Sequence, residues 1–154
     1  MSHILKIQSD FPLLDQVKLD KDKLFAEKIL AILNAEERVV PLQNDIFLHV
    51  VDDKGFRFWT KGDHIIQLQV IVLKDGKDLT DPKFPESIFT GIIYLESERF
   101  PKEISSLKDL YADQLTKDID SVQYGLNIYY LVLGFKKYTI WGDHQDQNIT
   151  SIFF

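Results

Sequence analysis

The sequence predicts an α+β fold: a single, mostly antiparallel β-sheet of about six to seven strands with two main helices. Several segments place apolar residues with a period of two, the spacing of a strand whose successive side chains point to opposite faces. The turns between them are rich in Asp and Gly and are too short for parallel crossovers, which take a dozen or more residues. Only two segments repeat apolar residues at helical spacing.

The N-terminal part predicts one strand and one helix. Residues 4–7 are expected to form a short edge strand. A helix is expected over residues 20–34, because five apolar residues recur there at helical spacing: Leu24, Phe25, Ile29, Ile32 and Leu33. Asp20 or Asp22 can cap its start, and Asn34 can end it in a left-handed turn.

A hairpin is predicted to lead into the strand at the centre of the sheet. It pairs residues 46–51 with residues 56–60, and the Asp52 and Gly55 between them suit a turn that ends in a left-handed glycine. The central strand, residues 65–73, mixes apolar residues with glutamines on one face. Its other face is wholly apolar and consists of Ile66, Leu68, Val70 and Val72.

The C-terminal half predicts a second helix between further strands. The helix is expected over residues 106–119, where Ser106 with Asp109 fits a capping box. Its buried stripe is predicted to be Ile104, Leu107, Tyr111, Leu115 and Ile119. The remaining strands are expected at residues 88–95, 123–134, 138–141 and 149–154.

Length and composition favour a single domain spanning residues 1–154. The absence of Cys excludes disulfides, thiolate catalysis and Cys-based metal sites. No basic leader precedes an apolar stretch, and no segment approaches the roughly 20 apolar residues of a membrane span, so a cytoplasmic protein with no membrane association is expected. The net charge of -6 argues against a nucleic-acid partner, which requires clustered Lys and Arg.

Two turns carry the same tripeptide, Gly-Asp-His. If they met at one sheet edge, Asp63 and His64 could join Asp143 and His144 in binding a metal or sharing a proton. The sequence favours the simpler interpretation that Gly-Asp is turn chemistry, so no metal, cofactor or catalytic residue is expected. His49 lies within a predicted strand and is interpreted as an outward or hydrogen-bonded structural histidine.

The acidic residues give the one candidate binding surface. The exposed side of the second helix and its exit present four carboxylates: Asp109, Asp113, Asp118 and Asp120. Such a surface can steer a basic protein into contact. The alternative is a surface that only keeps the protein in solution.

In size, acidity, lack of Cys and α+β architecture, the chain resembles immunity proteins that neutralise bacterial toxins of the polymorphic and contact-dependent inhibition type. The resemblance implies a cytoplasmic antidote, not an enzyme, that binds a basic toxin domain and covers its active site. Two other classes remain open. One is a secretion or assembly chaperone, dimeric and binding extended chains along a sheet edge. The other is a small metal-dependent enzyme that uses the two Gly-Asp-His turns.

Overall fold

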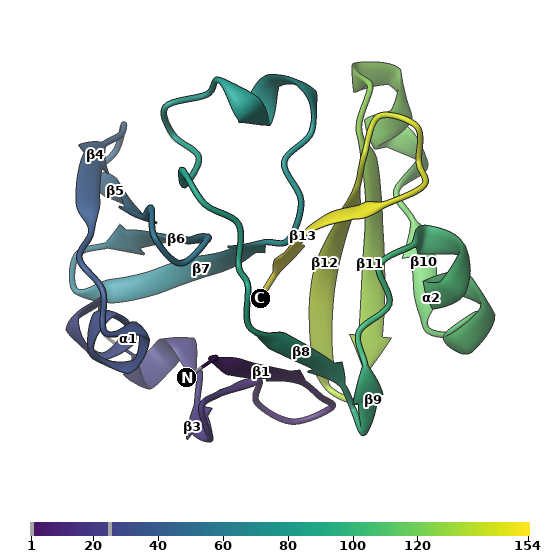
Figure 1. The fold of residues 1–154 in the computed structure, drawn as a ribbon, viewed down its shortest axis with the longest axis horizontal. Helices are drawn as coiled ribbons and strands as arrows, with labels where there is room; N and C mark the ends of the chain where they lie inside the picture. The colour runs from purple at the N-terminus through teal and green to yellow at the C-terminus, as the bar shows by residue number, and fades with distance from the viewer. Residues whose placement is uncertain (1, 25) are drawn as a thin grey trace.

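The computed structural model describes residues 2–24 and 26–154 and shows an α+β architecture with two mostly antiparallel sheets (Figure 1). Within these residues the larger sheet has eight strands in the order β10-β11-β12-β13-β7-β6-β5-β4, and the smaller has five in the order β3-β2-β1-β8-β9. The predicted fold class is confirmed. The prediction of a single sheet of six to seven strands is wrong.

The strands of the larger sheet are all antiparallel to their neighbours. They are β4 (Arg38–Pro41), β5 (Ile46–Val51), β6 (Phe56–Lys61), β7 (His64–Ile71), β10 (Leu115–Lys117), β11 (Asn127–Leu133), β12 (Lys136–Gly142) and β13 (Ile149–Phe153). The smaller sheet consists of β1 (Ile4–Ile7), β2 (Leu13–Leu14), β3 (Val17–Lys18), β8 (Ile92–Leu95) and β9 (Glu98–Arg99).

The smaller sheet forms because β1 and β8 pair with each other. The two strands are parallel, with Leu5 opposite Ile93 and Ile7 opposite Leu95. Leu5, Ile7 and Leu95 are buried, so this pairing closes one side of the core. β1 therefore lies in the middle of a sheet and not, as predicted, at an edge. Of the strand predicted over residues 88–95, only the second half forms a strand, β8.

The predicted hairpin is confirmed as β5 and β6, with Gly55 in the left-handed region at φ +66°. The next hairpin contains a bulge that the alternation pattern does not reveal. Trp59 pairs with Gln67 but Thr60 pairs with Ile65, which leaves Ile66 as an extra residue. The bulge turns Ile65 into the core and leaves Ile66 44% exposed, so the predicted apolar face of β7 is wrong at this end.

The first predicted helix is split into two pieces. A short 3-10 turn, η1 (Lys21–Lys23), is capped by the Asp20 carboxylate, which accepts from the Asp22 N–H. Leu24 is extended and α1 (Ala26–Leu33) follows, ending at Asn34 with φ 50° as predicted. Phe25, one of the five apolar residues of the predicted helix, lies outside the described residues.

The second predicted helix is much shorter than expected. α2 (Ile104–Leu110) ends before the chain becomes extended as β10, whose residues pair with β11 at the edge of the larger sheet. A 3-10 turn, η3 (Ile119–Tyr124), comes next; another, η2 (Gly76–Leu79), lies in the long connection to β8. The N-cap of α2 is Glu103, without a side-chain cap, so the predicted capping box at Ser106 is wrong.

The core lies between the two sheets and is covered by both helices. Ile29 and Leu33 of α1 are buried in it, as are Ile104 and Leu107 of α2. In Figure 1, β1 and β8 lie below β7 and β13 and beside the lower end of β12, and α1 and α2 lie at opposite ends of the molecule. No helix in residues 2–24 and 26–154 is long and apolar enough to cross a membrane.

Candidate protein-binding surface

The four predicted aspartates lie on different elements at the β10 end of the larger sheet. Asp109 is in α2, Asp113 is in the turn before β10, and Asp118 is the N-cap of η3, which contains Asp120. Because α2 ends at Leu110, they do not share one helical face as predicted. We call residues 109–126, which contain all four, the acidic–apolar segment.

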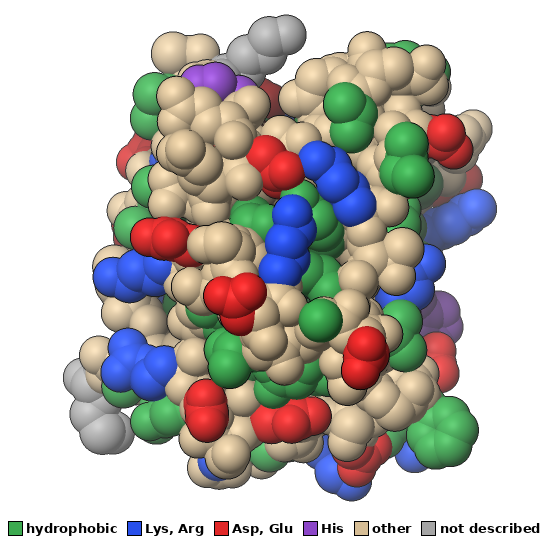
Figure 2. All heavy atoms as spheres, turned by 90° about the vertical axis from the view of Figure 1, so that its right-hand side faces the viewer, with side chains coloured by type: hydrophobic (Ala, Val, Ile, Leu, Met, Phe, Trp, Pro, Cys, Tyr) green, Lys and Arg blue, Asp and Glu red, His purple; other side chains and the backbone are tan. Residues whose placement is uncertain are grey.

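These four carboxylates have no cation in direct contact among the residues that the structure describes. The one cation of the segment, Lys117, has its ammonium 2.8 Å from an oxygen of Asp146, outside the segment. Figure 2 shows acidic side chains spread over this side of the molecule, with basic and hydrophobic side chains between them.

The segment also exposes five large hydrophobic side chains, which the sequence does not identify as exposed. One is Leu110 at the end of α2, and the other four lie in or beside η3. Ile119 is 80% exposed and Tyr124 is 75% exposed, and Val122 and Leu126 are exposed beside them. Ile119 was expected in the buried stripe of the second helix. Once the helix ends at Leu110, its position no longer follows the helical period, and the apolar residues of η3 point to solvent.

Hydrogen bonds hold these side chains on a fixed turn. The Ser121 hydroxyl contacts two carbonyls, those of Asp118 at 2.8 Å and Leu126 at 3.2 Å, which ties the two ends of η3 together. Gly125 ends the turn at φ +75°, in the left-handed region. The Asp118 carboxylate accepts from the Tyr130 hydroxyl at 3.0 Å, and this hydrogen bond raises the pKa of Tyr130. The backbone that carries the apolar groups is therefore already ordered before binding, which lowers the entropy cost of association.

A second cluster ties the base of the segment to the rest of the fold. The Tyr129 hydroxyl donates to Asp146 at 2.7 Å, and the Lys117 ammonium donates to the same carboxylate. Burial alone raises the pKa of Asp146, but the hydrogen bonds from Lys117 and Tyr129 outweigh it and hold this pKa below its usual value. The cluster joins β10 and β11 to the turn before β13.

The two Gly-Asp-His turns do not meet. His64 opens β7, whereas His144 contacts Asp75, which follows the other end of that strand. β7 has eight residues and spans roughly 23 Å at about 3.3 Å per step. The Asp75 carboxylate accepts a hydrogen bond from the His144 backbone N–H at 2.8 Å and also contacts the His144 imidazole. These contacts give the second Gly-Asp-His turn a structural role.

Asp143 and His49 are also structural. Asp143 is buried and accepts from the Gln147 N–H and the Asn148 amide, at 2.9 and 3.0 Å. His49 stacks on Phe58 and has one ring nitrogen 2.5 Å from Glu37 and the other 2.8 Å from Thr60, which agrees with a hydrogen-bonded structural histidine. Among the described residues, no group of three or more His, Asp or Glu side chains is placed to hold a metal ion.

A buried arginine that the sequence does not single out, Arg57 in β6, lies on the face of the larger sheet that is opposite the core. The Arg57 guanidinium is 3.8 Å from the Phe84 ring centroid and donates to Gln69 at 2.5 Å. It also donates to the Lys83 carbonyl, so it fastens the connection between β7 and β8 onto the sheet. Burial lowers its pKa to about 10, which leaves it charged at neutral pH.

Comparison of the chain with protein-family models, with curated proteins and with solved structures finds no match.

Proposed function

We propose that this chain is an acidic binding protein that neutralises a basic toxin domain by direct contact, in the manner of an immunity protein. The observation that carries the proposal is the acidic–apolar segment, where exposed Ile119, Val122 and Tyr124 lie among carboxylates that form no ion pair with the described residues. A surface that only maintained solubility would require the charges but not the apolar side chains between them.

The two kinds of group contribute different parts of binding. The carboxylates raise the rate of encounter with a positively charged partner, an effect that salt weakens. The apolar side chains, above all the ring of Tyr124, give contacts that exclude water and slow dissociation. The hydrogen-bonded turn of η3 reduces the entropy lost on binding, because its backbone is already ordered.

The first experiment isolates the partner and tests its activity. Affinity capture from the native organism with the wild-type chain is expected to retain a basic protein. Expressed alone, that protein should inhibit growth, and co-expression with this chain should restore growth. A captured protein that is harmless by itself would contradict neutralisation, even if it binds.

The second experiment tests the carboxylates with a charge-matched control. One variant carries four Asp→Asn changes in the segment, at Asp109, Asp113, Asp118 and Asp120. The control carries four at exposed positions elsewhere, at Asp10, Asp22, Asp45 and Asp53. In stopped-flow measurements with the captured partner, the first variant should associate more slowly and with a weaker salt dependence. If the two variants slow association equally, attraction of the partner depends on the net charge of the chain and not on the carboxylates of the segment.

The third experiment tests the apolar side chains. The double variant Ile119→Ser, Tyr124→Ser should dissociate faster and lose about 2 kcal/mol or more of binding free energy in calorimetry, the magnitude of interface hot spots. Its thermal stability should stay close to that of the wild type, because both side chains are largely exposed. Unchanged affinity would remove η3 from the interface.

A further inference from the structure

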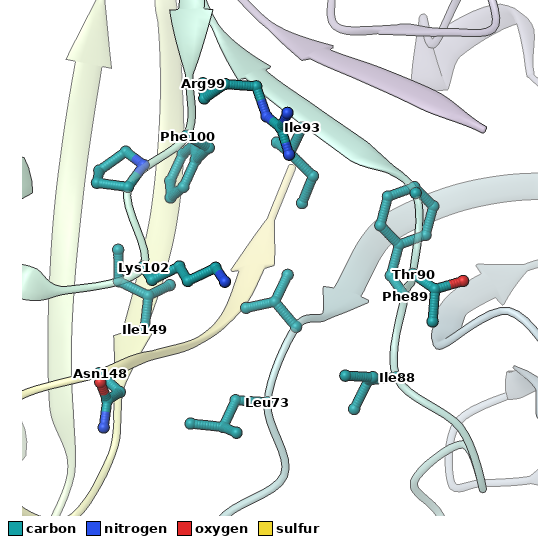
Figure 3. Close-up of a pocket in the computed structure, with 13 residues that line it drawn as sticks. Leu73, Ile88, Phe89, Thr90, Ile93, Arg99, Phe100, Lys102, Asn148 and Ile149 are labelled. Carbon is teal, nitrogen blue, oxygen red and sulfur yellow. The ribbon is translucent and has the colours of Figure 1, made fainter. Parts of the chain in front are cut away.

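A pocket of about 530 Å³ opens where the two sheets separate, and none of its described lining residues belongs to the acidic–apolar segment. It lies between β8, the residues that follow β9, and the chain around the end of β7 and the start of β13 (Figure 3). Its volume is within the range of small-molecule sites. Most of its described lining residues are apolar, among them Leu73, Ile88, Phe89, Ile93, Phe100 and Ile149.

The charged side chains that line this pocket are both cations. They are Arg99 and Lys102, and no Asp or Glu is among its described lining residues. Figure 3 shows the Arg99 guanidinium reaching toward Ile93 and the Lys102 amine extending toward the middle of the pocket. Within the described part of the chain, neither cation forms an ion pair.

This arrangement stands out in a chain with a net charge of -6 and 24 acidic residues. Arg99 also borders a smaller hollow with Glu96 and Glu98, yet it forms no ion pair with either carboxylate in the described structure. Two cations without carboxylate partners, beside an apolar surface, are electrostatically complementary to an anion that carries an apolar body.

The backbone beneath both cations is fixed. Arg99 is paired with Tyr94 in the β8–β9 ladder, and the Phe100 N–H donates to the Ile93 carbonyl at 2.8 Å. The Lys102 carbonyl accepts from the Ile149 N–H at 2.9 Å, which ties this residue to β13. The two charges therefore come from one short segment, residues 99–102, which is attached to the smaller sheet at Arg99 and to the larger sheet at Lys102.

We propose that this pocket binds a small amphipathic monoanion, a carboxylate with an alkyl or aryl body. The carboxylate lies between Arg99 and Lys102, where it accepts charge-assisted hydrogen bonds. The apolar body packs against Ile88, Phe89 and Ile93. None of the described lining residues of this pocket belongs to the acidic–apolar segment, and the proposal does not require the toxin partner.

Titration calorimetry with decanoate tests the proposal. Binding with one-to-one stoichiometry is expected, together with a rise in melting temperature, because a ligand that binds only the folded state stabilises it. Acetate lacks the apolar body, and decyltrimethylammonium has the opposite charge, so both should bind at least tenfold more weakly. Equal binding of decanoate and the decyl cation would overturn the role of the two cations.

Variants locate the site. Lys102→Gln and Arg99→Gln should each weaken decanoate binding about tenfold, as expected for the loss of one charge-assisted contact. Leu73→Glu places a carboxylate at the edge of the pocket, where it should compete with the ligand carboxylate for the two cations. The protein should stay folded, because the Leu73 side chain is partly exposed. Lys28→Gln, an exposed cation in α1, is the matched control and should leave binding unchanged.

Two further results would overturn the proposal. One is decanoate binding that all three pocket variants retain in full, since the ligand would then occupy another place. The other is co-sedimentation with phosphatidylglycerol vesicles in the absence of any binding to free decanoate, since the same cations would then recognise a lipid surface and not a free small molecule.

Discussion

Replacing Asp146 with Ala should destabilise the protein by about 2–3 kcal/mol at pH 7. The carboxylate accepts from the Tyr129 hydroxyl at 2.7 Å and from the Lys117 ammonium at 2.8 Å. Hydrogen bonds to charged groups contribute about 1.5–3 kcal/mol each. The contact with Lys117 is at the low end, because the two side chains are 33% and 26% exposed. For a chain of 154 residues this corresponds to a fall in melting temperature of roughly 4–12 °C.

The effect should depend on pH in a defined direction. The pKa of Asp146 is held below its usual value of 3.8 in the folded protein. The stabilisation is therefore fully present well above the unfolded-state pKa of 3.8 and is lost as the pH falls toward and through the lower, folded-state pKa. Urea denaturation at pH 7 and pH 2.5 should show the gap between wild type and Asp146→Ala narrowing at the lower pH.

Two controls make this prediction refutable. Asp146→Asn keeps an acceptor oxygen for Tyr129 but removes the charge, so its loss of stability should be intermediate. Asp109→Ala removes an exposed carboxylate without an ion-pair partner and should change stability by less than about 0.5 kcal/mol. If Asp146→Ala is as stable as Asp109→Ala, or if its deficit is the same at both pH values, the carboxylate does not join β10 to the fold as described.

Two other predictions concern turns. Gly55→Ala should lower the free energy of unfolding by about 2 kcal/mol or more in urea titrations, because its Cβ would lie 2.1 Å from the Phe89 backbone nitrogen at a φ of +66°. Gly76→Ala, with a positive φ but nothing within 4 Å, should lose only about 1 kcal/mol, and equal losses would count against the steric account. In an NMR titration, the His144 imidazole should have a pKa above 6.5, owing to its hydrogen bond with Asp75, and Asp75→Asn should lower it; an unaltered titration would contradict that contact.

Local patterns predicted the elements whose cause is local. The β5–β6 hairpin follows from its alternating residues and from Gly55, which takes the left-handed conformation that the turn requires. Asn34 ends α1 in the same conformation for the same reason. Each of these features depends on residues close together in the chain, so the sequence shows the cause directly.

Features that depend on distant partners could not be predicted. The parallel pairing of β1 with β8 divides the strands into two sheets, and the residues of neither strand indicate which strand it pairs with. The bulge at Ile66 turns Ile65 toward the core in place of Ile66, although the alternating pattern of apolar residues in the sequence shows no interruption there. β10 is extended because it pairs with β11, and this interrupts a segment whose own period is helical.

The sequence predicted the acidic residues of the candidate surface but not its exposed apolar residues. Composition and position found the four aspartates, but the helical period placed Ile119 in the core and concealed the apolar residues of η3. A local signal was present: Asp118 caps a short turn that Gly125 ends, which is the pattern of an independent 3-10 element. Arg57 had no such signal, because its partners Gln69 and Phe84 lie on other elements.

Hydrogen–deuterium exchange of the chain bound to its captured partner tests the central claim most directly. Slower exchange is expected in residues 118–126, the part of the acidic–apolar segment that carries η3, with no change in the β5–β6 hairpin. Protection confined to other elements, with exchange in residues 118–126 unaltered, would contradict the assignment of this surface to partner binding.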